Sequence, residues 1–312
     1  MVNPFHDALL SKDPFADILG LAETKQQLKS ALLVNRHVLI IGPPGVGKTT
    51  LAKNVAKLLP GAKGKEEEKF VRVQGSPDLT VEDLLGDIDP VKALKFGPTS
   101  KEAFTPGKIF KANEGILFFD ELNRCPEKVQ NALLQVLEEG KATIGSYLVD
   151  FPATFLFIGT MNPEETAATE KLSDVLMDRF DIVHMGYPDS EEIERQIVLA
   201  KSEKVAGVTF PPNLLASAIL FVRSLRDHKD VQKKPSVRAS IGLYERAQAN
   251  AALRKSKNVE AQDIADAMIS VLSHRVALKP SVKYLQTTEE FLGKEYAQFA
   301  REHGELKRGG DL

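Results

Sequence analysis

The sequence predicts an α/β fold in which helices cover a parallel β-sheet, followed by a smaller all-helical unit. Through the first 185 residues, apolar runs of strand length alternate with stretches of helical period, which is typical of a parallel sheet. From Pro188 onward the strand signal fades and amphipathic segments follow one another. We therefore expect two domains, 1–187 and 188–312, that meet at Pro188-Asp189-Ser190.

Each expected element rests on its own apolar pattern. The strands are expected at His37–Ile41, Lys69–Gln74, Ile116–Phe119, Thr154–Thr160 and Asp181–Met185. Helices of the first domain are expected at about 22–34, 48–59, 126–139 and 172–177, and those of the second at about 190–204, 212–226, 236–254 and 260–275.

Three stretches do not fit this alternation. Residues 75–113 contain eight scattered glycines and prolines around short apolar pieces, and we interpret them as an insertion. Residues 141–151 carry Gly145-Ser146 between two apolar runs, which suits a hairpin. The charged stretch 63–69 and the Gly309-Gly310 terminus are expected to be solvated.

Composition restricts the class of protein. The chain has 312 residues, of which 43% are apolar, so it can bury a large core. Lys plus Arg number 41 and Asp plus Glu 43, a net charge of -2, so no global field attracts nucleic acid. The single cysteine, Cys125, excludes a disulfide within the chain and favours a reducing compartment.

The beginning of the chain does not have the pattern of a secretory signal. His6 and Asp7 stand where such a signal needs a cationic flank and an unbroken apolar run. The longest apolar stretches fall far short of the roughly twenty residues that span a bilayer. We therefore expect a soluble, cytoplasmic protein with no membrane span.

A phosphate-binding loop is the most specific motif. It matches G-x-x-x-x-G-K-[ST] directly after an expected strand and at the start of an expected helix. Its glycines allow backbone N–H groups to surround a phosphate, Lys48 reaches the β- and γ-oxygens, and the Thr49 hydroxyl is a ligand for Mg²⁺. The expected nucleotide-binding residues here are Gly42, Pro43, Pro44, Gly45, Val46, Gly47, Lys48, Thr49 and Thr50.

Two carboxylates follow another apolar strand. Asp120 at the tip of the strand 116–119 can hold Mg²⁺, and Glu121 beside it can act as general base on the attacking water. Paired acids after a strand are often only a solvated loop. The phosphate loop upstream favours ATP hydrolysis instead.

Three further polar residues are candidates for the same reaction. Asn162 follows the strand that ends at Thr160 and is placed to orient the water, unless Asn162-Pro163 is an ordinary turn. Arg179 precedes a strand and can donate charge to a γ-phosphate, or form a surface pair with Asp178. Arg238 opens a helix of the second domain, where a cation is electrostatically unfavourable, and this favours a role at the phosphates.

These elements in this order resemble the AAA+ ATPases, and among them the MoxR family and the related ATPase subunit of magnesium chelatase. The stretch 119–134 is similar to the MoxR Walker B strand and its following helix, and Gly159–Pro163 to the sensor-1 strand. The stretch 176–180 is similar to the arginine-finger segment and 235–239 to sensor 2. Ile18-Leu19-Gly20 resembles the adenine-side segment, so Leu19 and Gly20 join the expected nucleotide-binding residues.

The resemblance implies a P-loop NTPase sheet sandwiched by helices and followed by a helical lid. It assigns 75–113 to a helix-2 insert, 141–151 to a pre-sensor hairpin and 272–275 to the end of the lid helices. It further implies a ring, typically of six subunits, with ATP and Mg²⁺ at each interface and Arg179 acting on a neighbour's site. MoxR-like proteins act as chaperones that activate partner complexes, often with a separate von Willebrand A protein or a metalloprotein client.

Alternatives to a protein-remodelling ATPase remain. A DNA-associated motor is one, because the segment 223–238 carries six Lys or Arg against two Asp. A magnesium-chelatase-type ATPase subunit is a second. A module that uses ATP only to set ring assembly is a third, although it would need none of Glu121, Asn162 and Arg179.

Overall fold

The computed structural model describes residues 4–11, 13–59, 69–97, 100–144, 147–163 and 172–306. It contains two compact units, one formed by Met1–Pro43 with Gly47–Met185 and the other by Pro44–Val46 with Gly186–Leu312. Most of the charged stretch 63–69, the residues Gly145-Ser146 of the expected hairpin and the Gly309-Gly310 terminus lie outside the described residues. No helix within the described ranges combines the length and the apolar character that crossing a bilayer requires.

The first unit is built on a five-stranded parallel sheet with the strand order β2-β5-β8-β1-β9. All five expected strands form, within a residue or two of their expected bounds. They are β1 (His37–Ile41), β2 (Phe70–Gln74), β5 (Ile116–Asp120), β8 (Leu156–Met161) and β9 (Phe180–His184). The central strands are buried on both faces, as their continuous apolar runs require.

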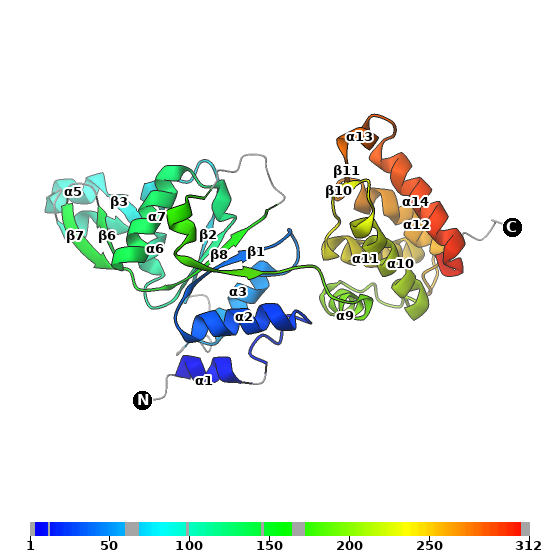
Figure 1. Ribbon diagram of the computed structural model, residues 1–312, viewed down its shortest axis with the longest axis horizontal. Coiled ribbons are helices and arrows are strands. Elements are labelled where there is room, and N and C mark those ends of the chain that lie inside the picture. Colours follow the sequence, from blue (N-terminus) through cyan, green and yellow to red (C-terminus); the bar gives the residue numbers. More distant parts are fainter. Residues whose placement is uncertain are drawn as a thin grey trace. The chain divides into compact units, whose positions relative to one another are not determined.

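Helices cover both faces of this sheet. One face packs in a core cluster that includes Leu39, Phe119 and Phe157 together with residues of the helix after β5. Figure 1 shows α2 and α3 on one side of β1 and α7 on the other. The helices of this unit outside the insertion are α1 (Pro4–Leu10), α2 (Ala22–Leu33), α3 (Lys48–Lys57), α7 (Glu127–Glu139) and α8 (Asp174–Met177).

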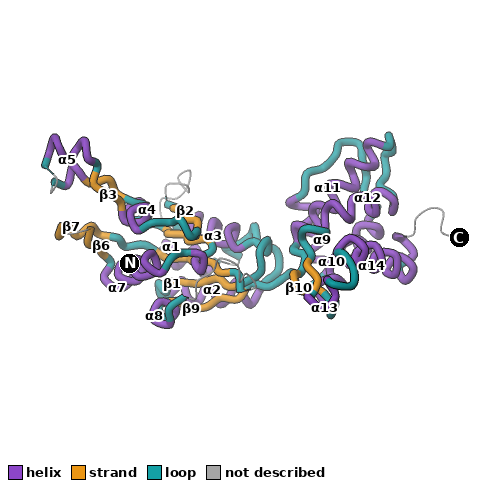
Figure 2. The backbone as a smooth tube through the Cα atoms, turned by 90° about the horizontal axis from the view of Figure 1, so that it is seen from above, coloured by secondary structure: helices purple, strands orange, loops and turns teal. Residues whose placement is uncertain are grey.

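The stretch 75–113 folds into short elements rather than one loop. A capping box at Thr80 begins the first helix, and Asp89 caps the second by accepting from the N–H groups of Val91 and Lys92. The elements are α4 (Val81–Leu85), β3 (Gly86–Ile88), α5 (Pro90–Phe96), β4 (Phe104–Pro106) and α6 (Lys108–Lys111). Strands β6 (Lys141–Ile144) and β7 (Tyr147–Pro152) form the antiparallel hairpin, and Figure 2 shows it at the same end of the unit as α5 and β3.

The second unit is helical around its own core, in which Phe221, Leu243 and Met268 are buried. It also contains a short antiparallel strand pair and a final long helix that the sequence analysis did not predict. Its helices are α9 (Glu191–Lys201), α10 (Pro212–Asp227), α11 (Val237–Leu253), α12 (Ala261–Leu272), α13 (Pro280–Lys283) and α14 (Thr288–Glu302), and its strands are β10 (Val231–Lys233) and β11 (Ala277–Leu278).

Candidate nucleotide site

The loop between β1 and α3 has the backbone conformation that its glycines permit. Gly45 and Gly47 take φ values of 77° and 105°, in the region open to glycine. Gly42 donates its N–H to the Met161 carbonyl at 3.1 Å, and a Cβ on Gly42 would stand 2.1 Å from the Met185 carbonyl oxygen. The chain therefore turns tightly at the sheet edge and enters α3, whose first N–H groups have no acceptor within the helix.

Lys48 begins α3 and turns back onto the loop. Its ammonium donates to the carbonyls of Gly42 at 2.5 Å and Pro43 at 3.0 Å. These two carbonyls hold the positively charged Lys48 ammonium against the first residues of the phosphate loop. A polyphosphate seated there would offer stronger, charge-assisted acceptors.

Asp120 ends β5 at the same edge of the sheet. Its Oδ1 accepts from the Thr160 hydroxyl at 2.7 Å, and its Oδ2 pairs with Arg72 at 2.6 Å. The carboxylate is 14% exposed. Since only β8 lies between β5 and β1, Asp120 stands about 10 Å across the edge from the phosphate loop.

Glu121 is the first residue beyond β5 and has a left-handed φ of 58°. Its Oε2 accepts from Gln74 at 3.0 Å and from Arg124 at 2.8 Å. Gly75, the residue after β2, lies so close to Glu121 that a Cβ on Gly75 would stand 2.1 Å from the Glu121 carbonyl oxygen. This packing fixes the backbone of Glu121 while its carboxylate rests on two donors.

Thr160 joins the two acidic residues, and the sequence analysis assigned it no role. Its fully buried hydroxyl donates to Asp120 and accepts from the Glu121 N–H at 3.0 Å. Gln74 and Arg72 were missed as well. The available signal was position, because all three are polar residues at or near the carboxyl ends of expected strands.

The donor set suits magnesium. The Thr49 hydroxyl and the Asp120 carboxylate are hard oxygen ligands, and Mg²⁺ is commonly held by one or two protein oxygens together with substrate phosphates and water. Among the described residues, no group of three or more His, Cys, Asp or Glu side chains could hold a metal alone. The residues present therefore fit an ion that arrives with a nucleotide.

Two more expected residues lie at this edge. Met161 pairs with Ile41 in register, so Asn162 leaves β8 beside the start of the phosphate loop. The Ile18 Cδ1 lies 3.7 Å from the position of a Cβ on Gly47. The adjoining Leu19 and Gly20 thus lie near the loop, immediately before α2.

Arg179 lies at the opposite edge. It directly precedes β9, whose first residue Phe180 pairs with His37 at the amino end of β1. Its guanidinium forms an ion pair with Glu138 on α7. Five residues of strand, about 16 Å, separate it from the edge that carries the phosphate loop.

Arg238 belongs to the second unit, where it is exposed in the first turn of α11. Arg275 lies within electrostatic reach. Its pKa is lowered, first by burial and then by the charge of Arg238. Two neighbouring guanidinium groups are a local concentration of positive charge.

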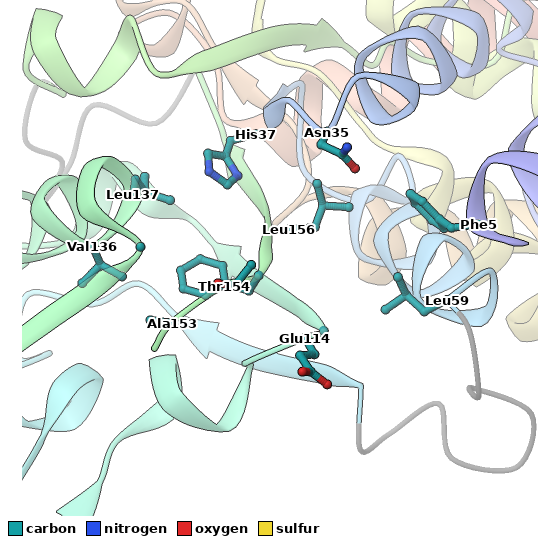
Figure 3. A pocket seen from close by; sticks show the side chains of 13 residues that line it. Phe5, Asn35, His37, Leu59, Glu114, Val136, Leu137, Ala153, Thr154 and Leu156 are labelled. Carbon is teal, nitrogen blue, oxygen red and sulfur yellow. The ribbon is translucent and has the colours of Figure 1, made fainter. Parts of the chain in front are cut away.

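A depression of about 600 Å³ opens at the amino edge of the sheet, away from the phosphate loop (Figure 3). His37, Glu114 and Leu137 are among the residues that line it. His37 Nδ1 accepts the Phe157 N–H at 3.2 Å. Burial, and secondarily Arg36, lower the pKa of His37.

Comparison with known proteins follows the same division of the chain. Residues 37–182 match the ATPase family associated with various cellular activities (AAA), and residues 223–292 match the AAA lid domain. YeaC of Bacillus subtilis is 32% identical, over 85% of this chain and 85% of that protein. Chaperone MoxR1 of Mycobacterium tuberculosis is 29% identical, over 84% and 73%. The chain is an AAA+ ATPase of the MoxR group.

As an AAA+ ATPase, the protein has ATP hydrolysis as its family activity, with Mg²⁺ as the usual metal and rings as the typical assembly. A point mutant of RuvB from Thermotoga maritima has the same fold, with a TM-score of 0.54 at 18% identity over 83% of this chain and 72% of that one. The predicted sheet followed by a helical lid is thereby confirmed.

Proposed function

We propose that this AAA+ ATPase forms a ring, typically a hexamer, and uses ATP hydrolysis to remodel or activate a partner protein complex. One observation carries the proposal: the phosphate loop, Asp120 and Glu121 share one edge of the sheet, while Arg179 stands at the other. Arg179 is too far to serve the loop of its own chain. A neighbouring copy is the natural recipient of its charge.

Hydrolysis uses residues of one chain together with Arg179 of a neighbouring copy. In this reaction Lys48 exchanges the loop carbonyls for β- and γ-phosphate oxygens. Thr49 and Asp120 would hold Mg²⁺, which would supply positive charge to neutralise the charge that develops on the phosphate oxygens. Glu121 gives up its hydrogen bonds to Gln74 and Arg124 and accepts a proton from water. As it does so, the water oxygen bonds to the γ-phosphorus, and the bond between this phosphorus and ADP breaks. Asn162 orients the water and the neighbour's Arg179 stabilises the γ-phosphoryl group.

The remaining residues complete nucleotide binding and its readout. Gly42, Pro43, Pro44, Gly45, Val46 and Gly47 wrap the phosphates with main-chain N–H groups, and Thr50 extends the start of the helix. Leu19 and Gly20 take the adenine side. Arg238 reports the state of the phosphates to the lid, which changes its angle on hydrolysis.

The client is a protein complex. The name of the relative Chaperone MoxR1 supports this class. A separate von Willebrand A protein or a metalloprotein is the partner that MoxR resemblance suggests, and the lone buried Cys125 favours a reducing, cytoplasmic setting. A magnesium-chelatase-type role would use the same ATP chemistry with a different client.

The DNA-motor alternative loses part of its basis. Of the six cations in 223–238, Arg223 and Arg226 form ion pairs with the buried Glu194. One of these two positive charges is therefore balanced within the second unit. Counting Glu194 with the segment leaves six cations against three carboxylates, a local excess of three rather than four for a phosphate backbone.

The first test separates ATP binding from hydrolysis. Lys48→Ala is expected to abolish ATP binding, and Glu121→Gln to bind ATP normally while turnover falls by at least about a hundredfold, because the general base is lost. Calorimetry with ATP and phosphate release measure the two steps. The exposed residues Lys53 and Glu127 provide matched controls, Lys53→Ala and Glu127→Gln, on the same helix as Lys48 and on α7. Normal turnover by Glu121→Gln would contradict the assignment of the base.

The client test uses the stalled protein. Glu121→Gln with ATP should hold its client, and affinity capture should recover a protein complex that Lys48→Ala does not retain. Recovery of a metalloprotein or a von Willebrand A protein supports the proposal. Recovery of DNA in place of protein would favour the alternative.

A further inference from the structure

A buried ion network lies in the second unit outside the nucleotide site. Glu194, on the first turn of α9, is fully buried. Its two oxygens accept from Arg226 in a bidentate pair at 2.7 Å and 2.7 Å, from Ser240 at 2.6 Å and from Arg223 at 3.2 Å. Burial would raise the pKa of Glu194, but these donors outweigh it and lower the pKa. The carboxylate is charged and has all its acceptor positions filled.

The two arginines of this network extend it to the segment by which the chain enters the unit. Arg223 also donates to the carbonyls of Pro188 at 2.9 Å and Asp189 at 3.4 Å. The Arg226 guanidinium lies over the Tyr187 ring at 4.7 Å from its centroid. Residues 187–189 follow β9 with only Met185 and Gly186 between them and that strand. Arg223 and Arg226 of the second unit thus bind the segment 187–189, which begins three residues after the end of β9.

The same network holds the beginning of α11. Arg226 Nε donates to the Pro235 carbonyl at 2.8 Å, one residue before the N-cap Ser236. Ser240, in the first turn of α11, donates to Glu194. Arg238 lies between these two attachment points. Its backbone is therefore fixed relative to residues 187–189.

We propose that Glu194, Arg226, Arg223 and Ser240 form a bracket that makes the entry segment 187–189 and the Arg238-bearing turn of α11 move as one body. This rests on the proposed role of Arg238. A shift of Arg238 on loss of the γ-phosphate is passed by the bracket to the chain leaving β9, without deformation of the lid core between them. The four residues are positioning residues, since none of them touches the nucleotide in this scheme.

A network of this kind is unnecessary for stability alone. A buried ion pair seldom stabilises more than a well-packed apolar replacement. Here the charged groups also bind three main-chain carbonyls and an aromatic ring that belong to segments before α9 and before α11. Apolar packing would hold the helices together but would not fix those segments in one orientation.

The test uses Arg223, because its side chain is 26% exposed and its loss leaves the Glu194–Arg226 pair intact. Arg223→Gln should lower kcat about ten- to a hundredfold, as misplacement of a remote catalytic group does, with the Kd for ATP changed less than about twofold. Arg254→Gln is the matched control, since it breaks an ion pair with the buried Asp263 elsewhere in the same unit. That control should lower Tm comparably and leave kcat unchanged.

A double-mutant cycle separates positioning from general weakening. If Arg223 acts through Arg238, the variant Arg223→Gln/Arg238→Ala should turn over no more slowly than Arg238→Ala alone. Multiplicative losses in kcat, or an unchanged kcat in Arg223→Gln, would overturn the bracket. An unchanged kcat in Arg238→Ala would instead overturn the proposed role of Arg238, so the two failures are distinguishable.

Discussion

Single hydrogen-bonding groups position the acidic pair. Thr160 contributes one hydroxyl, and that hydroxyl satisfies both the Asp120 carboxylate and the Glu121 N–H. Glu121 has a left-handed φ, which disfavours a residue with a side chain unless its surroundings hold it there. The hydrogen bond to its N–H helps to supply that restraint. Thr160 therefore positions both the metal ligand and the base proposed above.

We expect Thr160→Val to lower kcat about tenfold or more, since it removes the hydroxyl at nearly constant volume and misplaces both acidic residues. Unfolding free energy should fall by about 1–3 kcal/mol, because a buried N–H loses its acceptor. Thr160→Ser keeps the hydroxyl and should retain most of the turnover. Phosphate release and urea unfolding measure the two effects. Wild-type turnover by the valine variant would show that the hydroxyl positions nothing.

At the scale of elements, the parallel sheet separates two kinds of edge. Its carboxyl edge collects the phosphate loop, the acidic pair and Asn162, because every parallel strand ends there. Its amino edge holds Arg179 and the depression of Figure 3. His37 lies there as well, in surroundings that lower its pKa and so favour the neutral imidazole. His37 Nδ1 accepts the Phe157 N–H, so this imidazole ties the beginnings of β1 and β8 together.

A pH dependence follows from this contact. The pKa of folded His37 lies below its unfolded value of about 6.5, so the unfolded chain takes up the proton first as pH falls. Stability from this residue is complete above about pH 6.5 and is lost as pH falls from there toward the folded pKa. His37→Asn retains an acceptor without a titrating ring and should flatten this part of the profile.

Urea midpoints at about pH 7.5, 6.5 and 5.5 test the expectation. The exposed His184 on β9 supplies the control, and His184→Asn should keep the wild-type profile. An identical acid-side loss in His37→Asn and the parent would contradict a neutral, accepting imidazole.

At the scale of the whole molecule, the proposed site is incomplete within one chain. Arg179 precedes β9 at the edge away from the phosphate loop, and it is paired with Glu138. The proposed ring would bring the amino edge of one copy to the carboxyl edge of the next. Turnover should then depend on assembly, and a lone monomer should hydrolyse ATP poorly.

Mixed rings test this dependence. Arg179→Ala should lose turnover, since the γ-phosphoryl charge is no longer neutralised, while ATP binding is kept. Mixing it with Glu121→Gln subunits should restore part of the activity, because their intact Arg179 serves sites whose Glu121 is intact. Phosphate release across a series of mixing ratios is the measurement. If no mixing ratio restored activity, or if a diluted monomer kept full turnover, Arg179 would not act on a neighbour's site.

The sequence by itself determined the five strands, the phosphate loop and the division into a sheet domain and a helical lid. These follow from local signals: apolar runs, glycine spacing and helical period. The strands β10 and β11 are too short to show a period in the sequence. Helix α14 was not predicted, although the Thr287–Glu290 capping box marks its beginning. Only the tertiary structure decided which polar groups meet. Thr160 with Glu121, Gln74 with Glu121 and Arg223 with Glu194 are contacts across 29 to 47 residues, which arise from strand order and helix packing and leave no mark in local sequence.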